Sequence, residues 1–453
     1  MFSARFCAVT TISSSLATPS PEEFWAGLCA CAAVRNDRRV QTGIATRTPR
    51  VAGSQCATSP LPGKLPHATT PSRRAMSPEY DFVVIGGGMI GSAIAAHLAE
   101  HASVRLLEME DQPGYHSTGR SAAIFSEAYG NDLVRAITRA SREFFYSPPP
   151  NFTSIALVRP RQVLITAHGG QEGALEKFME STASAGDVQR QSVAEAVGLC
   201  PVLRPSELVG AALSRNPADI EVHELQHGYL RWLKARGGVV STGTRVMEID
   251  NHVGGWTVVT TQGAIRARTI VNAAGAWAGE IARLAGAQHV GLRPLRRTAC
   301  LIESPAGVPV DTWPMLLNVE EEFYLKPDAG LLLLSPADET DTAPCDAQAD
   351  ELDIAIAVDR LERATTLEVR RIAHRWAGLR SFVEDRSPVL GYDEQQPGFF
   401  WLAALGGYGI QTAPALSRIA ASLALRRPID ASLLDFGIDP MQMSPARIRE
   451  ALA

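Results

Sequence analysis

A glycine pattern of the form G-x-G-x-x-G follows the apolar run at residues 81–85, with its glycines at Gly86, Gly88 and Gly91. Such glycines allow a tight turn, a close approach of the backbone to a pyrophosphate, and close packing of a helix on a strand. The helix after the loop would also offer free N–H donors and the positive end of its dipole to the phosphates. This spacing predicts a dinucleotide-binding loop; the alternative is a tight turn that holds no ligand.

An acidic residue, Glu108, closes a second apolar run at residues 104–107 and follows Gly91 by 17 residues. A carboxylate at this place can accept hydrogen bonds from the ribose hydroxyls of an adenosine. A glycine pattern alone says little, because glycine-rich turns are common. The order strand, glycine loop, helix, strand and acid is far more specific, and it indicates a nucleotide cofactor such as NAD or FAD.

The segment at residues 114–123 (GYHSTGRSAA) helps to decide between these two cofactors. It combines small residues, hydroxyls and one cation, so it can run along a pyrophosphate and lay small side chains against an isoalloxazine ring. A simple NAD-binding domain has no use for such a segment at this place. The composition therefore favours FAD, while Ser117 or Thr118 could also cap the start of a helix.

Five distant segments together resemble the FAD-dependent D-amino-acid oxidoreductase family, and the resemblance covers the chain from about Tyr80 to its end. The segments are residues 115–125 (YHSTGRSAAIF), 271–277 (VNAAGAW), 323–330 (FYLKPDAG), 376–382 (WAGLRSF) and 406–412 (GGYGIQT). Within the family, four of them look most like the bacterial FAD-dependent D-arginine dehydrogenases.

The resemblance implies contacts to FAD at several places. Residues 272–277 would form a second FAD contact, and the backbone of Val246 would meet the adenine. The N–H groups of residues 406–412 would face the flavin N1–C2=O edge, where negative charge grows on reduction; the alternative is an ordinary flexible loop. The residues predicted to contact FAD are Gly86, Gly88, Met89, Ile90, Gly91, Glu108, Ser117, Thr118, Arg120, Ser121, Ala122, Val246, Ala274, Gly275, Trp277, Gly406, Gly409, Ile410 and Gln411.

A cation that binds a carboxylate is expected beside the flavin. Arg380 is the candidate, because a guanidinium gives two parallel hydrogen bonds to one carboxylate. By the resemblance, Arg297, Tyr129 and Tyr324 match the remaining carboxylate ligands of the family. The carbonyl of Gly407 would accept from the substrate amine. A single arginine is usually a surface residue and a single tyrosine usually packs, so the prediction depends on the whole set.

Two residues depart from the D-arginine dehydrogenases. Gln162 stands where those enzymes have a glutamate near the distal guanidinium, and Ile124 stands where they have a histidine. An amide does not neutralise a buried cation as a carboxylate does, and isoleucine removes a polar partner. We therefore expect a side-chain pocket, with Met315 and Leu317 as further members, that favours neutral D-amino acids over D-Arg and D-Lys.

The predicted reaction is oxidation of the CH–NH2 group of a D-amino acid by hydride transfer to flavin N5. The imino acid then hydrolyses to a 2-oxo acid and ammonia. The alternatives are a FAD-dependent 2-hydroxy-acid or N-methyl amino-acid oxidoreductase, and a flavin protein without activity. A quinone, another carrier or oxygen would accept the electrons. Because no cysteine follows Cys345, we expect noncovalent FAD.

Short apolar runs alternate with helical patterns, which predicts an α/β fold of two domains, a Rossmann-like FAD-binding domain interleaved with a sheet-rich substrate domain. The first would comprise residues 78–147, 221–290 and 375–440, and the second residues 148–220 and 291–374. Strands are predicted at residues 81–85, 104–107, 163–166, 239–242, 245–249, 256–261, 264–267, 269–273 and 399–403. Helices are predicted at residues 89–101, 131–145, 171–184, 222–236, 348–367 and 410–426.

Composition limits the class of protein. A chain of 453 residues can form two domains, and no stretch approaches the ~18–20 apolar residues of a membrane span. The formal charge of −5 divides into +6 on residues 1–75 and −11 on the remainder, which gives no reason to expect binding of nucleic acid. The widely spaced Cys200, Cys300 and Cys345 indicate neither a disulfide framework nor a metal site.

Residues 1–75 are rich in Ser, Thr, Pro and Arg and poor in acids. This is the composition of a transit peptide or a disordered leader. In the other interpretation they are an upstream mis-start, and the protein begins at Met76. We expect a cytoplasmic protein, or a mitochondrial one if the segment is a transit peptide.

Overall fold

β1 (Tyr80–Ile85) is an inner strand of a mixed eight-stranded sheet in the computed structural model, which describes residues 79–183 and 186–448. The predicted leader lies outside these residues. β1 pairs in parallel with β2 (Val104–Leu107) and β12 (Gly263–Asn272). The described strands that complete this sheet are β9 (Val239–Ser241), β10 (Val246–His252), β11 (Gly255–Thr260), β19 (Val389–Tyr392) and β20 (Phe399–Ala403).

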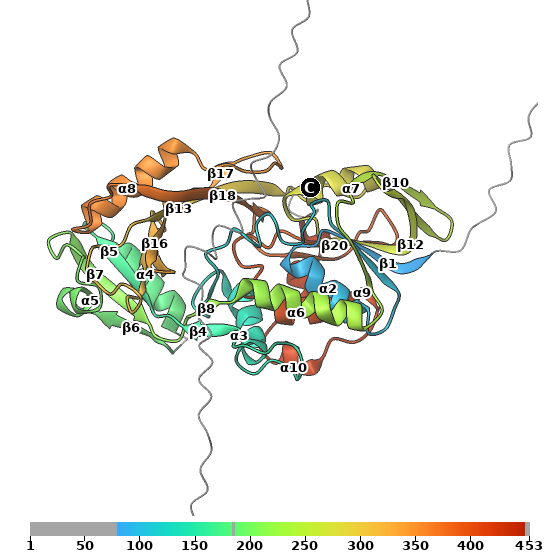
Figure 1. The fold of residues 1–453 in the computed structure, drawn as a ribbon. Helices are drawn as coiled ribbons and strands as arrows, with labels where there is room; N and C mark the ends of the chain where they lie inside the picture. Colours follow the sequence, from blue (N-terminus) through green and yellow to red (C-terminus); the bar gives the residue numbers. More distant parts are fainter. Residues whose placement is uncertain (1–78, 184–185, 449–453) are drawn as a thin grey trace, which may run out of the picture. The chain divides into compact units, whose positions relative to one another are not determined.

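Both faces of β1 are covered, which explains its continuous apolar sequence. Phe82 and Val84 belong to a core with α2 (Met89–Leu98), whereas Val83 and Ile85 pack with α7 (Ala278–Ala285) on the opposite face. α2 lies beside α6 (Val222–Ala235) and α9 (Ala413–Ala424) (Figure 1), and alanines on the surface of α2 allow these helices to approach closely. The helices that join α2 in this layer are α3 (Asp132–Tyr146), α6 and α9.

A second sheet of nine strands, counted among the described residues, forms the other half of the fold. Its longest pair is β13 (Arg293–Ile302) with β18 (Ile372–Phe382), antiparallel along its whole length. The other strands are β5 (Val163–His168), β6 (Val188–Gln191), β7 (Leu208–Ser214), β14 (Met315–Asn318), β15 (Tyr324–Asp328), β16 (Leu331–Ser335) and β17 (Thr340–Asp341). The helices on this sheet are α4 (Glu172–Thr182), α5 (Val193–Leu199) and α8 (Glu351–Ala364).

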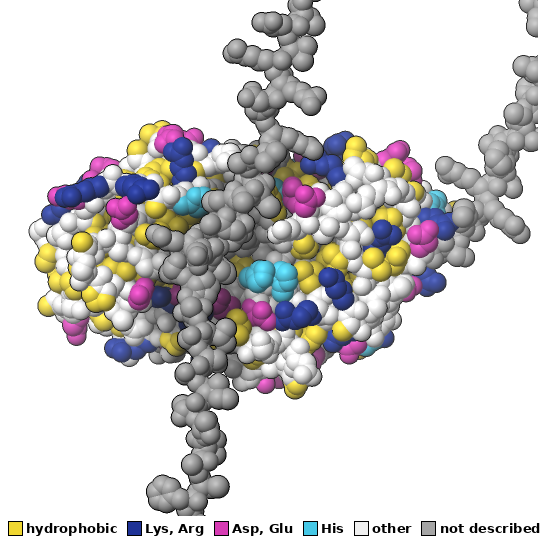
Figure 2. Space-filling view, in the orientation of Figure 1, with side chains coloured by type: hydrophobic (Ala, Val, Ile, Leu, Met, Phe, Trp, Pro, Cys, Tyr) yellow, Lys and Arg dark blue, Asp and Glu magenta, His cyan; other side chains and the backbone are white. Residues whose placement is uncertain are grey.

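A three-stranded sheet and short helices complete the description. The sheet contains β3 (Ile124–Phe125), β4 (Val158–Pro160) and β8 (Ala218–Ile220). The short helices are η2 (Gly275–Trp277), α10 (Ala431–Leu434) and η3 (Pro440–Met443). Of the helices that the structure describes, none is both long and apolar enough to cross a bilayer. On the face in Figure 2, basic and acidic side chains are interspersed.

The alternation of strands and helices confirms the predicted mixed α/β class, but three details differ. The two strands predicted at residues 264–267 and 269–273 form one strand, β12, because its first half pairs with β11 and its second half with β1. β18 belongs by its hydrogen bonds to the second sheet, although residues 375–440 were assigned to the FAD-binding domain. The predicted final helix begins only at Ala413 and is followed by α10. The division into two domains otherwise stays a prediction.

Candidate functional site

A cavity of about 250 Å³ opens where the parallel strands β1, β2 and β12 end. In sheets of this kind, ligands bind outside the carboxyl ends of the strands. One part of the cavity is lined by the glycine loop, Glu108 and Val246, and another by Arg380 and the turn that contains Gly406. The cavity therefore lies between the eight-stranded and the nine-stranded sheet, and its lining residues come from segments throughout the described chain.

The three glycines of the loop have different roles. Gly86 has φ +106°, and a Cβ there would lie 2.4 Å from the carbonyl oxygen of Ala273. A Cβ on Gly91 would lie 1.9 Å from the carbonyl oxygen of Gly86. Both glycines are therefore required by the fold. A Cβ on Gly88 would meet only the Thr118 hydroxyl, at 3.4 Å, so the fold alone does not require this glycine.

The start of α2 is arranged to receive an anion. Its N-cap residue, Gly88, provides no side-chain cap, and the first N–H groups of a helix have no partner within it. The Gln226 side chain, from α6, holds the loop by donating to the carbonyl oxygen of Gly87 at 2.7 Å. The sequence analysis missed this residue, since a glutamine on an amphipathic helix carries no signal of its own.

Glu108 lies at the end of β2 as predicted and is only 7% exposed. Its Oε2 accepts from the N–H of Gly87 at 2.8 Å, and its Oε1 accepts from the N–H of Glu110 at 2.9 Å. Burial raises the pKa of Glu108, and these two N–H groups limit the rise. Each oxygen can accept a further hydrogen bond, so the carboxylate remains able to bind ribose hydroxyls.

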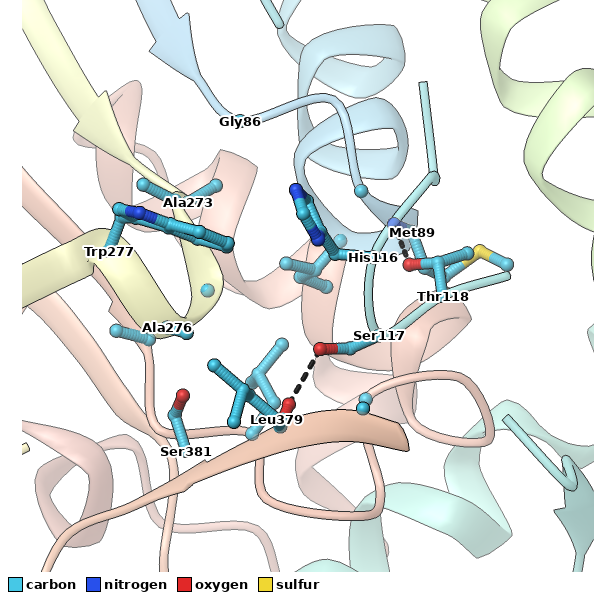
Figure 3. Close-up of a pocket in the computed structure, with 18 of the residues that line it drawn as sticks. Gly86, Met89, His116, Ser117, Thr118, Ala273, Ala276, Trp277, Leu379 and Ser381 are labelled. Atoms are coloured by element: carbon cyan, nitrogen blue, oxygen red, sulfur yellow. Dashed lines mark hydrogen bonds between the residues drawn. The ribbon is translucent and has the colours of Figure 1, made fainter. Parts of the chain in front are cut away.

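The segment at residues 114–123 forms turns, so the alternative of a helix start is not realised. Thr118 Oγ1 accepts from the N–H of Met89 at 3.0 Å, and Ser117 Oγ donates to the carbonyl oxygen of Leu379 at 2.6 Å (Figure 3). The segment thus connects the start of α2 with β18, across the cavity. His116, which we did not predict, packs against Trp277 with ring centroids 4.6 Å apart on the cavity wall.

Arg120 and Gln411, which were also predicted to contact FAD, have protein partners as well. Arg120 donates from Nη1 to the carbonyl oxygens of Ala347 and Ala377, both at 3.0 Å. Gln411 is 2% exposed; it accepts from the N–H of Ser126 and donates to Thr138. Of the predicted set, all but Gly91 and Gln411 line the larger cavity.

A second cavity of about 80 Å³ adjoins the first. Both are lined by Arg380, Arg297, Tyr324 and Gly407, and Tyr129 lines the smaller one. The residues predicted to bind the substrate carboxylate and amine therefore meet at the junction of the two cavities. They come from β18, β13, β15 and two loops, so only the fold brings them together.

Arg380 is the cation that can receive a carboxylate. Among the residues that the structure describes, no acidic side chain lies within 4 Å of its guanidinium. Burial works against this charge, but the neighbouring Tyr129 and Tyr324 raise the pKa of Arg380 above its usual value. A Cβ on Gly407 would lie 2.8 Å from Arg380 Nη1, so the turn approaches the guanidinium closely only because residue 407 is glycine.

Arg297 is held differently, by protein acceptors. Its Nε donates to the carbonyl oxygen of Asp338 at 2.7 Å, and its Nη2 lies 3.4 Å from Glu339. Glu339 also accepts from Arg386 at 2.7 and 3.0 Å. Burial opposes the charge of Glu339, but the two arginines lower its pKa. Arg297 and Arg386 therefore share one carboxylate, that of Glu339.

The smaller cavity has mainly apolar walls. Ile124, Met315 and Leu317, all predicted for the side-chain pocket, line it. Gln162 does not; its carbonyl oxygen accepts from the N–H of Met315 at 2.9 Å, next to β5. The lining also includes one carboxylate that the sequence analysis did not select, that of Glu321.

Two of the seven described non-glycine residues with a positive φ line the cavities. Ala404, on the wall of the larger cavity, has φ +58°, and Glu321, on the wall of the smaller, has φ +56°. Arg386, which holds Glu339, has φ +56°. Such conformations in residues with side chains cost about 1–3 kcal/mol each and are found mainly at functional sites. They agree with the placement of the site at this junction.

The comparisons with known proteins agree with the geometry of the cavities. Residues 81–423 match the model of the DAO family, described as FAD dependent oxidoreductase. The glycine oxidase of Geobacillus kaustophilus (strain HTA426) is 23% identical over 376 residues, which is 80% of this chain and 97% of the relative. The mitochondrial dimethylglycine dehydrogenase of Mus musculus is 23% identical over 401 residues, 80% of this chain and 45% of the relative.

A solved structure shows the same fold. The crystal structure of glycine oxidase from Geobacillus kaustophilus aligns with a TM-score of 0.70 and 21% identity, over 81% of this chain and 98% of that chain. None of these three proteins is a D-arginine dehydrogenase, so the likeness to that branch stays a prediction. The residues of the larger cavity fit FAD, with an acceptor at Glu108, the N–H groups that follow Met89 at the start of α2, and only the Thr118 hydroxyl close to a Cβ built on Gly88. The chain therefore belongs to the DAO family of FAD-dependent oxidoreductases, and FAD is its cofactor.

Proposed function

We propose that this protein oxidises the CH–NH2 group of a D-amino acid to an imino acid, which water hydrolyses to a 2-oxo acid and ammonia. The observation that carries the proposal is Arg380, a cation without an acidic partner among the described residues, at the junction of the cofactor cavity and a small apolar cavity. The bound flavin supplies the acceptor for the hydride. The protein's own residues bind and orient the substrate.

Arg380 would bind the α-carboxylate through two parallel hydrogen bonds. The hydroxyls of Tyr129 and Tyr324 would donate to the same carboxylate; burial raises the pKa of Tyr129, which keeps its proton in place. The carbonyl of Gly407 would accept from the substrate amine. With both ends held, the Cα–H bond keeps one direction, and such positioning contributes a large part of catalysis.

The walls of the smaller cavity support a preference for neutral side chains over D-Arg. Val163, Ile165 and Phe178 line it together with Ile124 and the two residues of β14. An extended cationic side chain would lose its hydration against these walls, on which the exposed Glu321 is the one described acidic residue, whereas an alkyl side chain gains by burial. The proposed substrates are therefore small D-amino acids with uncharged side chains.

A second candidate is oxidation of glycine or an N-methyl amino acid. It is favoured by the names of the relatives, a glycine oxidase and a dimethylglycine dehydrogenase, and by the small volume of the second cavity, about 80 Å³. The same carboxylate site would serve, because both substrate classes carry one carboxylate beside the reacting C–N bond. A side chain on Cα marks the first class of substrate; its absence (glycine) or a methyl group on the amine marks the second.

Anaerobic bleaching of the flavin separates these candidates. We expect D-Ala or another neutral D-amino acid to bleach the bound flavin faster than D-Arg, L-amino acids, glycine, sarcosine or 2-hydroxy acids. Faster bleaching by sarcosine or glycine would move the protein to the second candidate, and no bleaching by any of them would refute the proposed activity. Admission of air afterwards tests the acceptor, for which we propose a quinone or similar carrier; slow reoxidation is the expected result.

We expect the flavin to be noncovalent. Cys200 and Cys300 are buried, Cys345 is exposed, and none of the three lines the larger cavity. Burial raises the pKa of Cys300 to about 11, so its thiol is unreactive at neutral pH. Denaturation in acid followed by ultrafiltration should place all flavin absorbance in the filtrate. Flavin that stays with the polypeptide would show a covalent bond.

A further inference from the structure

We propose that Glu321 makes the substrate site reject a second carboxylate, so that only amino acids whose side chain carries no negative charge are accepted. The inference deepens the proposed function, since it names the charge class of the same site's substrate. It arises from a residue for which neither the sequence pattern nor the relatives gave a role.

Glu321 lies in the turn between β14 and β15, within three consecutive glutamates. The other two, Glu320 and Glu322, both accept from Nε2 of Gln171, at 2.9 and 3.2 Å. The side chain of Asn318 also accepts from the N–H of Glu320, at 2.9 Å. These contacts give the two outer glutamates a structural role in holding the turn on α4.

The middle glutamate is placed differently. Its φ of +56° is in the left-handed region, and the residue, which is exposed, lines the smaller cavity together with Tyr129 and Arg380. Among the residues that the structure describes, its carboxylate has no hydrogen-bond or ion-pair partner within the usual distances, unlike those of Glu320 and Glu322. The turn thus places one solvent-exposed carboxylate, unpaired within the described chain, beside the substrate cavity, on a backbone in the left-handed region.

The charge of Glu321 acts on the substrate-binding residues. Burial, Tyr129 and Glu321 together raise the pKa of Tyr408 to about 12. Burial opposes the charge of Arg380, and Glu321 contributes to its raised pKa after the larger contributions of the two tyrosines. These effects place the carboxylate within electrostatic range of the cation that would bind the substrate.

A substrate with two carboxylates would need a second cation at this site. Arg380 would be occupied by the α-carboxylate, and Arg297 already lies 3.4 Å from Glu339, a carboxylate that it shares with Arg386. A second carboxylate on the substrate would therefore find apolar walls and the like charge of Glu321, and it would also lose its hydration there. Rejection of a competitor through a like charge is a common source of specificity.

The test compares the FAD-loaded protein with Glu321→Gln and with the matched control Glu322→Gln. Both variants remove one negative charge from the same turn, but only Glu321 lines the cavity. The probes are butyrate and succinate, which have the same carbon number and carry one and two carboxylates at pH 8. Their dissociation constants are measured by calorimetry and by the shift of the flavin absorbance bands.

We expect the preference for butyrate over succinate to fall about tenfold in Glu321→Gln and to stay unchanged in Glu322→Gln. An unchanged preference in Glu321→Gln, or an equal fall in both variants, would refute the proposal. These binding measurements need no turnover. The preference for butyrate could fall in Glu321→Gln alone while no D-amino acid bleaches the flavin. The proposed oxidation would then be refuted, and the proposal that Glu321 rejects a second carboxylate would be supported.

Discussion

Replacing Arg380 by methionine is expected to lower kcat/KM for the substrate that bleaches the flavin fastest by roughly 10²- to 10³-fold, because loss of one partner from a buried carboxylate pair costs about 3–4 kcal/mol. Methionine fills much of the same space, so FAD should stay bound. The loss should fall mainly on KM, since the carboxylate is bound both before and during the reaction. Rates of anaerobic flavin reduction and the FAD content of each preparation measure both effects.

The control for this variant is Arg375→Met. Arg375 lies on the same strand, β18, but it is exposed and pairs with Glu351. An odd separation of five residues directs the two side chains to opposite faces of the strand. Its replacement should leave kcat/KM unchanged. Normal activity of Arg380→Met with FAD bound would show that the carboxylate binds elsewhere.

The part of the site predicted most directly from sequence is the part built from neighbouring residues. β1, the glycine loop, α2, β2 and Glu108 follow each other within about thirty residues. Local chemistry decides their structure, because a positive φ at residue 86 and the lack of space beside Gly91 both require glycine. The spacing of these glycines and of Glu108 along the chain was therefore enough to predict how they are arranged at the cofactor cavity.

Residues whose role depends on distant partners were predicted less well. Arg120 was predicted to contact FAD and does line the larger cavity, but the carbonyl oxygens of Ala347 and Ala377 that hold its guanidinium were not predicted. No local pattern reveals that pairing across more than 200 positions. Gln162 was assigned to the side-chain pocket, yet Val163 and Ile165, which share one face of β5, line the cavity instead. A strand alternates its faces, so a shift of one position reverses the direction of a side chain.

Glu321 illustrates a different limit. Three consecutive glutamates look alike in sequence, and their composition suggests only a solvated turn. Gln171, about 150 residues earlier in the chain, donates to Glu320 and Glu322. Glu321 has a positive φ and no such partner, so its role differs from theirs. Backbone conformation and a long-range contact, neither of which a spacing rule contains, decide which carboxylate lines the cavity.

Gly88→Ala is expected to lower the affinity for FAD roughly 100-fold without weakening the apoprotein, because the second glycine of the loop lets the backbone approach the pyrophosphate. Gly88 has φ −68°, which alanine adopts readily, and the added Cβ would meet only the Thr118 hydroxyl at 3.4 Å. The unfolding temperature of the apoprotein should therefore stay near that of the wild type. Titration with FAD, followed by quenching of flavin fluorescence, measures the affinity.

Gly91→Ala provides the comparison, because its added Cβ would lie 1.9 Å from the carbonyl oxygen of Gly86. It should lower the free energy of unfolding of the apoprotein by about 1–3 kcal/mol, as overpacking does. Wild-type FAD affinity in Gly88→Ala would contradict a close approach of the pyrophosphate at this residue. Equal destabilisation of the apoprotein by both substitutions would instead mean that all three glycines serve the fold. Since the two residues belong to one motif, only this pair of measurements separates its ligand-binding role from its structural role.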